Sequence, residues 1–254
     1  MRTERIDFPG PHGKLSAKLD APAGTPRAYG IFAHCFTCGK DSLAASRVAR
    51  ALAAHGIGVL RFDFAGLGSS HGDFADTNFS SNVEDLVAAA DYLREKFAAP
   101  KLLIGHSLGG AAVLAAAHRV PEAKAVATIA APSDPHYVVH KLLSEHLDTI
   151  ARQGEARVNL AGRDFNIRQH FVEDAGQHQL HDRIATLGRA LLVMQAPQDD
   201  TVSMDNATRI FELAQHPKSF ISLDGMDHLI TRREDAAYVA GVISAWSARY
   251  LDAR

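Results

Sequence analysis

Residues 102–117, LLIGHSLGGAAVLAAA, join a run of leucine and isoleucine to an alanine-rich run through Gly-His-Ser-Leu-Gly. The first run predicts a buried strand and the second a helix, since alanine has the highest helix propensity. Gly105, Ser107 and Gly109 fit the pattern G-x-S-x-G, which in a strand-to-helix turn presents a serine nucleophile. Glycine on either side removes the Cβ atoms that would clash in so sharp a turn. We therefore expect Ser107 at a helix N-terminus, where free amides favour developing negative charge. The alternative is a glycine-rich helix entry with an incidental serine, which these flanks disfavour.

Outward from this stretch, short apolar runs alternate with helical patterns, as in a mainly parallel sheet covered by helices. Residues 5–9 and 15–21 alternate apolar and polar positions, which predicts an antiparallel hairpin that turns at 9–13. Gly56 is placed to end the first helix, and Ser81 with Glu84 predicts a capping box at the start of the second. Further strands are expected at 29–34, 58–64, 101–106, 124–132, 190–197 and 219–225, and helices at 42–56, 81–97, 108–120, 205–216 and 235–251.

The alternation stops between residues 133 and 187, where the chain is polar, rich in histidine and helix-like in part. No long core strand is evident there. A stretch of this length inside a regular α/β pattern is too long for a mere loop. We expect one domain, residues 1–254, in which residues 133–187 are an insertion that forms a lid over the site that the sheet presents.

The composition is that of an ordinary globular protein. Of 254 residues, 46% are hydrophobic and 22% are charged, and the net charge is −2. Basic and acidic residues are interspersed, without the basic block that a phosphate backbone requires, so no nucleic-acid partner is expected. No apolar signal-peptide region and no stretch long enough to span a bilayer are present, so no membrane partner is expected. Two cysteines are too few for a disulfide framework, which favours a cytoplasmic protein.

A serine hydroxyl needs a base that takes its proton and an acid that orients the base. In proteins built around G-x-S-x-G the chain order is serine, acid, histidine. His228, one of 14 histidines, follows the last predicted strand, and it is the expected base. Asp199 follows the preceding strand and is the expected acid. Its neighbour Asp200 and two aspartates beside the histidine, Asp224 and Asp227, remain rivals, with turn and cap roles as their alternative.

Several segments resemble the α/β-hydrolase superfamily, and the match covers the whole chain. More narrowly, they resemble the hydrolase half of bacterial proteins that join an α/β hydrolase to an OsmC-like domain. The resemblance implies an α/β-hydrolase fold with an eight-stranded sheet, an ester or related acyl substrate, and no cofactor. The OsmC-like domain of the fused relatives is expected to be absent here, because the chain ends at Arg254 after the last predicted helix. The segments are 27–41, 58–74, 78–86, 105–117 and 216–229.

The resemblance also implies an oxyanion hole. In α/β hydrolases the strand before the first large helix often ends in His-Gly and an apolar residue whose amide is one of the two donors. The matching positions are His34, Cys35 and Phe36, with cysteine where glycine is usual. The Phe36 amide and the Leu108 amide after the nucleophile are therefore the expected donors.

Cys35 and Cys38 form a C-x-x-C pair in this same loop, AHCFTCGK, residues 33–40. Such a pair after a strand could have a lowered thiol pKa and serve as a redox module. No thioredoxin-like pattern surrounds it, so a wall position beside the oxyanion hole is favoured. If the two form a disulfide, we expect the oxidised protein to be the less active esterase. A zinc site at His178 and His181 is disfavoured because no acidic or cysteine ligand stands at a fixed spacing, and no metal is expected.

The function expected from these residues is cleavage of a small carboxylic ester through an acyl-serine, in the manner of a carboxylesterase. A hydrolase fold that binds without catalysis is the remaining alternative. A homodimer remains open, because the oligomeric state depends on how the lid folds. The residues expected to line an apolar acyl pocket are Cys35, Leu143, Phe171, Met226 and Leu229.

Overall fold

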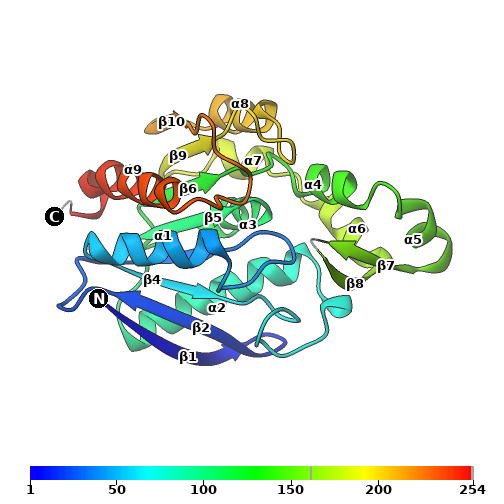
Figure 1. Ribbon diagram of the computed structural model, residues 1–254, viewed down its shortest axis with the longest axis horizontal. Coiled ribbons are helices and arrows are strands. Elements are labelled where there is room, and N and C mark those ends of the chain that lie inside the picture. The colour runs from blue at the N-terminus through cyan, green and yellow to red at the C-terminus, as the bar shows by residue number, and fades with distance from the viewer. Residues whose placement is uncertain (161, 253–254) are drawn as a thin grey trace.

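The predicted sheet is present in the computed structural model, which describes residues 1–160 and 162–252. The sheet has eight strands in the order β1-β2-β4-β3-β5-β6-β9-β10 (Figure 1). β1 pairs antiparallel with β2, and β2 antiparallel with β4, whereas the remaining neighbours are parallel. The mostly parallel sheet and its antiparallel N-terminal hairpin are thereby confirmed. The strands are β1 (Arg2–Gly10), β2 (Gly13–Ala21), β3 (Ala28–Ala33), β4 (Ile57–Phe62), β5 (Leu102–His106), β6 (Ala125–Ile129), β9 (Ala190–Gln195) and β10 (Lys218–Ser222).

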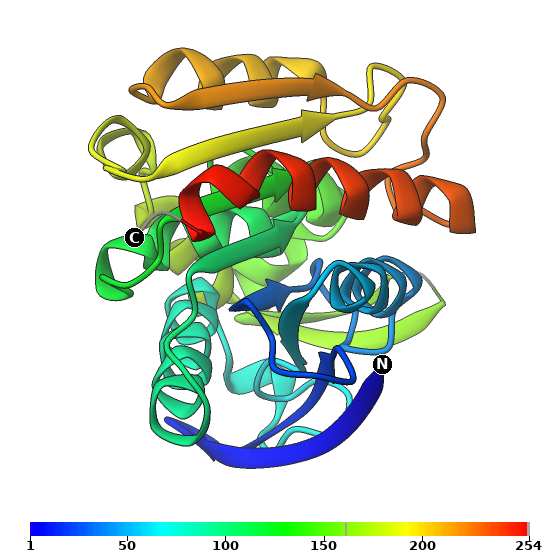
Figure 2. The same ribbon diagram turned by 90° about the vertical axis from the view of Figure 1, so that its left-hand side faces the viewer.

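Helices cover both faces of the sheet, as predicted. α1 (Leu43–Ala54) and α9 (Arg233–Leu251) pack together on one face, and α2 (Phe79–Lys96) and α3 (Leu108–Ala116) on the other (Figure 2). Two hydrophobic clusters, one on each face, fill the spaces between helices and sheet. The central strands β3, β4, β5, β6 and β9 are buried at nearly every position, which explains why they are continuous apolar runs in the sequence.

The segment between β6 and β9 adds no strand to the sheet. It contains α4 (Pro135–Leu143), α5 (Leu147–Gln153), α6 (Gln169–Gln177) and α7 (His181–Ala185). It also contains a separate antiparallel hairpin, β7 (Glu155–Leu160) and β8 (Arg163–Arg168), which the sequence pattern did not indicate. In Figure 1 α5, β7 and β8 stand at the end of the molecule toward which the central strands point. Two elements outside this segment are 3₁₀ turns, Phe74–Asp76 and Ala117–Arg119, and α8 (Met204–Leu213) follows β9.

The start of α2 differs from the predicted capping box. Asn78 is the N-cap: its side chain accepts from the Ser81 amide at 2.7 Å, and the Ser81 hydroxyl accepts from the Asn78 amide at 3.0 Å. Ser81 is therefore the inner partner of the box rather than its first residue, and the prediction was wrong. Glu84 lies a turn further along, where its carboxylate pairs with Arg119. Asparagine caps as well as serine does, so the extended Asn78 begins the helix three residues earlier.

Asp85 lies on the buried side of α2, where its carboxylate accepts a 2.8 Å hydrogen bond from the Ala65 amide. Burial raises the pKa of Asp85 to about 6, although that hydrogen bond acts to lower it. The folded protein therefore holds this proton more tightly than the unfolded chain does. The free energy of unfolding consequently falls as pH rises from about 4 to about 6, and the loss persists above that range.

We expect Asp85→Asn to remove this fall, which amounts to at most about 3 kcal/mol, because asparagine accepts the same bond without a charge. Urea unfolding of both proteins across this pH range measures the difference. Asp91→Asn, an exposed site on the same helix, is the matched control and should keep the wild-type pH dependence. If the free energy of unfolding depended on pH in the same way for wild type and Asp85→Asn, a buried Asp85 that titrates in this range would be contradicted.

Among the described residues, no helix is both long and apolar enough to cross a membrane.

Candidate active site

Ser107 occupies a sharp turn between β5 and α3, with φ 54° and ψ −126°. This left-handed backbone is rare for a residue with a side chain, and strain of this kind is concentrated at functional positions. Steric contacts require glycine at the two neighbouring positions of the pattern, Gly105 and Gly109. A Cβ on Gly105 would lie 2.3 Å from the Gly109 oxygen, and a Cβ on Gly109 would lie 2.3 Å from the Ala33 oxygen. The turn can form only where both positions are glycine.

The three side chains expected to act together form one chain of hydrogen bonds. His228, in the loop after β10, has its Nε2 atom 3.1 Å from the Ser107 Oγ atom. Its Nδ1 atom lies 2.8 Å from Asp199 Oδ2, in the loop after β9. These loops follow the carboxyl ends of the strands, the edge at which open α/β sheets hold their ligands. In this order an imidazole can take the hydroxyl proton while the carboxylate fixes its tautomer.

Asp199 is held as an ionised acceptor. Its Oδ1 atom accepts from the amides of Thr201 and Val202 at 2.8 and 2.9 Å, and Gln195 donates to Oδ2 at 3.2 Å. Burial acts to raise the pKa of Asp199, but the hydrogen bond and charge of His228, together with the two amides, bring it below its usual value. The carboxylate therefore keeps its charge beside the imidazole.

The rival aspartates have other partners. Asp224 accepts from the Ser222 hydroxyl at 2.7 Å, and Asp227 accepts from the Leu229 amide at 2.9 Å and from Thr231. Asp200 accepts from the Thr201 hydroxyl at 3.2 Å. Within the described chain, the imidazole of His228 is hydrogen-bonded to no carboxylate other than that of Asp199.

His106, the residue before Ser107, contacts the backbone of His228, the expected base. Its Nε2 atom donates a 2.7 Å hydrogen bond to the carbonyl of His228, and the two rings lie 5.2 Å apart. Burial, with the nearby His228 as a second cause, lowers the pKa of His106 to about 3, so the ring is a neutral donor. His106 therefore links the turn at Ser107 to the loop that carries His228.

The expected oxyanion donors lie near each other. Phe36 and Leu108 line one small cavity beside the turn. In residues 1–160 and 162–252, neither of their amides has a hydrogen-bond acceptor, so both donors are free. The loop that carries Phe36 is closed by a disulfide between Cys35 and Cys38, whose Cα atoms are 5.3 Å apart. The Cys38 amide also donates to the Cys35 carbonyl at 3.1 Å, and Thr37 between them has a positive φ of 58°.

A cavity of about 620 Å³ opens over Ser107 and His228. Of the expected pocket residues, Cys35 and Leu229 line it. Leu143, Phe171 and Met226 do not: the first two lie in the core beneath the insertion, and the third in the core under α9. One step along a helix turns a side chain by about 100°, so Leu142 reaches the cavity where Leu143 cannot. The remaining lining residues are Phe36, Thr37, Cys38, Leu160, Arg163, Asp200, Thr201, Asp227 and Thr231.

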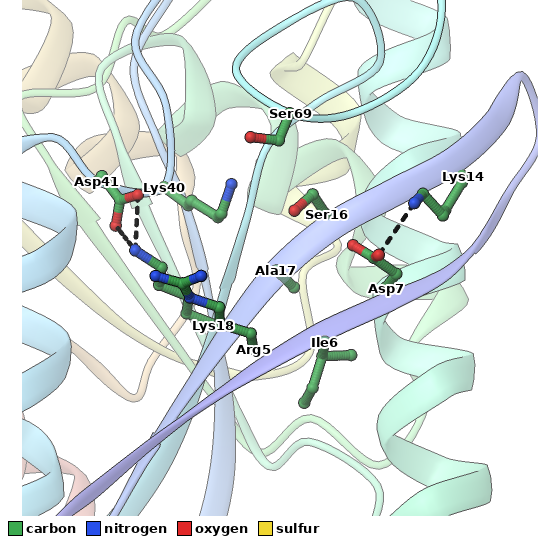
Figure 3. Close-up of a pocket in the computed structure, with 10 residues that line it drawn as sticks. All are labelled: Arg5, Ile6, Asp7, Lys14, Ser16, Ala17, Lys18, Lys40, Asp41 and Ser69. Atoms are coloured by element: carbon green, nitrogen blue, oxygen red, sulfur yellow. Dashed lines mark hydrogen bonds and ion pairs between the residues drawn. The ribbon is translucent and has the colours of Figure 1, made fainter.

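A second cavity, of about 460 Å³, lies on the β1–β2 side and is lined by none of the three catalytic candidates (Figure 3). Its three lysines are paired with aspartates, Lys14 with Asp7, Lys18 with Asp41 and Lys40 with Asp63, whereas its arginine, Arg5, has no ion pair among the described residues. No group of three or more metal-binding side chains is present in the part of the chain that the structure describes.

Sequence reasoning missed three contributors to this site. His106 is one of the 14 histidines, and its place inside G-x-S-x-G is the signal that could have indicated its role. Gln195 ends a predicted strand, and no pattern marks its side chain as a partner of Asp199. Arg163 lies on the hairpin that the sequence did not reveal.

The strand order and the serine turn define an α/β hydrolase. The chain belongs to the Hydrolase_4 family, described as serine aminopeptidase, S33, which matches residues 25–180. The crystal structure of an esterase domain from a Rhodothermus marinus protein is 48% identical, with a TM-score of 0.81, and the match covers 99% of this chain and 100% of that one.

Two more distant relatives carry enzyme names. The rat mitochondrial palmitoyl-protein thioesterase ABHD10 is 32% identical over 149 residues, 56% of this chain and 48% of that protein. The chain thus spans about half the length of this curated relative. The ferulic acid complex of Est1E from Butyrivibrio proteoclasticus is 20% identical, with a TM-score of 0.80 over 98% of this chain and 100% of that one. At that identity the likeness shows the fold alone. Together with the family match, the esterase and thioesterase relatives establish a hydrolase.

Proposed function

We propose that this hydrolase cleaves carboxylic esters of small molecules through an acyl-enzyme on Ser107. The observation that carries the proposal is the hydrogen-bond chain from Ser107 through His228 to Asp199, with contacts of 3.1 and 2.8 Å. The esterase domain at 48% identity supports an ester substrate. The apolar side chains that line the cavity, among them Phe36, Leu142 and Leu229, support an acyl group with little charge near the reacting carbon.

In the proposed reaction His228 takes the proton of Ser107 as the hydroxyl attacks the ester carbonyl. The free amides of Phe36 and Leu108 stabilise the oxyanion, and each such donor contributes about 10²- to 10³-fold in rate. The imidazolium then protonates the departing alcohol. The same imidazole activates water, which releases the acid from the acyl-serine. Asp199 remains ionised throughout and stabilises the charged ring.

The insertion, residues 133–187, acts as a lid in this proposal. Leu142 on α4 and Leu160 on β7 both line the cavity above Ser107. A single domain with such a lid encloses the acyl group and excludes water from it. The proposed setting is the cytoplasm, with a small-molecule ester as partner.

Labelling by a fluorophosphonate tests the proposed nucleophile. A fluorophosphonate is expected to modify the wild-type protein on Ser107, as read by peptide mass, and to block hydrolysis of p-nitrophenyl butyrate in the same proportion. A hydrolase fold that only binds would remain unlabelled and inactive. Modification at another serine would contradict the assignment.

The disulfide between Cys35 and Cys38 favours a second candidate role, in thiol redox chemistry. Both cysteines line the cavity over Ser107, so a dithiol there could reach a substrate. Insulin reduction that persists in Ser107→Ala would support this candidate. In the proposed esterase the pair instead fixes the loop that carries the Phe36 amide.

We expect the reduced protein to hydrolyse p-nitrophenyl butyrate several-fold faster than the disulfide form. The disulfide restricts where the Phe36 amide can lie, so in the oxidised form this donor reaches the oxyanion less well than in the reduced form, and losing one donor entirely costs about 10²- to 10³-fold. The measurement compares rates in protein that mass spectrometry shows to be fully oxidised or fully reduced. Cys38→Ser, which cannot form the bond, should match the reduced rate under both conditions. Equal rates in the two wild-type forms would contradict this role.

A further inference from the structure

The hairpin β7–β8 presents an apolar inner face that contains one charged residue. Successive side chains of a strand point to opposite faces. On β7 the inner face consists of Ala156, Val158 and Leu160, which are buried or half-buried, and on β8 of Phe165 and Ile167, both buried. Arg163 is two residues from Phe165 on the same strand and pairs across the hairpin with Leu160. The alternation therefore places Arg163 on the inner face, and it lines the cavity over Ser107.

The guanidinium of Arg163 is held in place without a counter-charge. Its carbon lies 5.1 Å from the centre of the Phe165 ring, a cation–π contact, and Nη1 donates to the Thr37 carbonyl at 3.2 Å. Two arginines of the outer face, Arg157 and Arg168, form ion pairs with carboxylates. Among the described residues, no carboxylate lies within ion-pair distance of Arg163.

The two aspartates that line the same cavity are engaged elsewhere. Asp227 accepts from the amides of Leu229 and Thr231 and from the Thr231 hydroxyl. Asp200 accepts from the Thr201 hydroxyl, and Lys141 reaches its carbonyl rather than its carboxylate. The cavity therefore combines apolar sides with two carboxylates that are hydrogen-bonded to neutral groups and one arginine whose remaining donors are available. In the second cavity (Figure 3) two lysines are paired with aspartates that line the same cavity, Lys14 with Asp7 and Lys18 with Asp41.

We propose that Arg163 determines specificity by binding a second, free carboxylate of the ester substrate. A guanidinium presents paired N–H donors that fit a carboxylate in two parallel, charge-assisted hydrogen bonds. The preferred substrates are then half-esters of dicarboxylic acids, whose carbon chain lies along the apolar sides while the free carboxylate reaches Arg163. This proposal rests on the proposed esterase function.

The test uses two nearly isosteric substrates. One is the mono-p-nitrophenyl ester of adipic acid, and the other is the same ester with its free carboxylate replaced by a carboxamide. We expect wild-type kcat/KM to favour the charged ester by about tenfold or more, mostly through KM. Arg163→Gln should bring the ratio of the two values close to one, and Arg163→Lys should restore part of it. Added salt should lower the wild-type ratio.

The matched control is Arg157→Gln, on the outer face of the same hairpin, which should keep the wild-type ratio. If Arg163 only stabilises the lid through its hydrogen bond to Thr37, Arg163→Gln will lower kcat/KM for both esters by the same factor and leave their ratio unchanged. That result, or a wild-type ratio near one, would overturn the proposal while the esterase function stands. If the wild-type protein hydrolyses neither ester, the esterase function fails. Calorimetric binding of the adipate half-ester to wild type and Arg163→Gln then decides the role of Arg163.

Discussion

Ser107→Ala is expected to lower hydrolysis of p-nitrophenyl butyrate by at least about 10⁴-fold. The hydroxyl is the group that would form the acyl-enzyme, and no other hydroxyl is hydrogen-bonded to the His228 Nε2 atom within the described residues. The measurement is kcat/KM from p-nitrophenolate release, with active-site labelling of the same samples.

The protein should remain folded when Ser107 becomes alanine. The hydroxyl makes no hydrogen bond to the core among the described residues, and alanine adopts the φ of 54° about as badly as serine does. An unchanged melting temperature therefore separates lost chemistry from lost structure. Ser46→Ala, on the far helix α1, serves as a control that keeps full activity. Wild-type turnover in Ser107→Ala would contradict the nucleophile assignment.

Asp199→Asn is expected to lower kcat by about 10⁴-fold, because an amide cannot stabilise the imidazolium and favours the wrong tautomer of His228. Asparagine can still accept from the amides of Thr201 and Val202, so the loop should keep its shape. Steady-state kinetics at neutral pH measure the effect.

The neighbouring aspartates supply matched controls for this result. Asp200→Asn and Asp224→Asn should each stay within a few-fold of wild type, because their carboxylates contact Thr201 and Ser222 rather than His228. A large loss of kcat in either variant, while Asp199→Asn remains active, would assign the role of the acid to that residue instead of Asp199. Such an outcome would also conflict with the 2.8 Å contact between Asp199 and His228.

The sequence was sufficient to predict the sheet, because its central strands are buried on both faces and are therefore continuous apolar runs. The turn at Ser107 was visible for a similar local reason, since only glycine tolerates the contacts at Gly105 and Gly109. The positions of Asp199 and His228 followed from the rule that loops after successive parallel strands meet at one edge of the sheet. Each of these signals is carried by a few neighbouring residues.

The features that the sequence could not give depend on contacts between distant segments. The short hairpin β7–β8 buries few side chains, so its alternation is hidden among polar residues. Leu142 and Leu143 are equally apolar, and only the orientation of α4 decides which one meets the cavity. Asn78 and Ser81 are both good caps, and Asn78 is the one whose backbone is extended, as an N-cap requires.

The hydrogen bond between Ser107 and His228 joins residues 121 positions apart, across β5, β6, β9 and β10. β10 is the outermost strand on its side of the sheet and is near the end of the chain in sequence. Contacts of such large sequence separation form late in folding, since the cost of closing the loop precedes any gain. In the proposed mechanism, Ser107 therefore gains its base only when the outermost strand is docked, so its reactivity depends on the edge of the sheet as well as on its own turn.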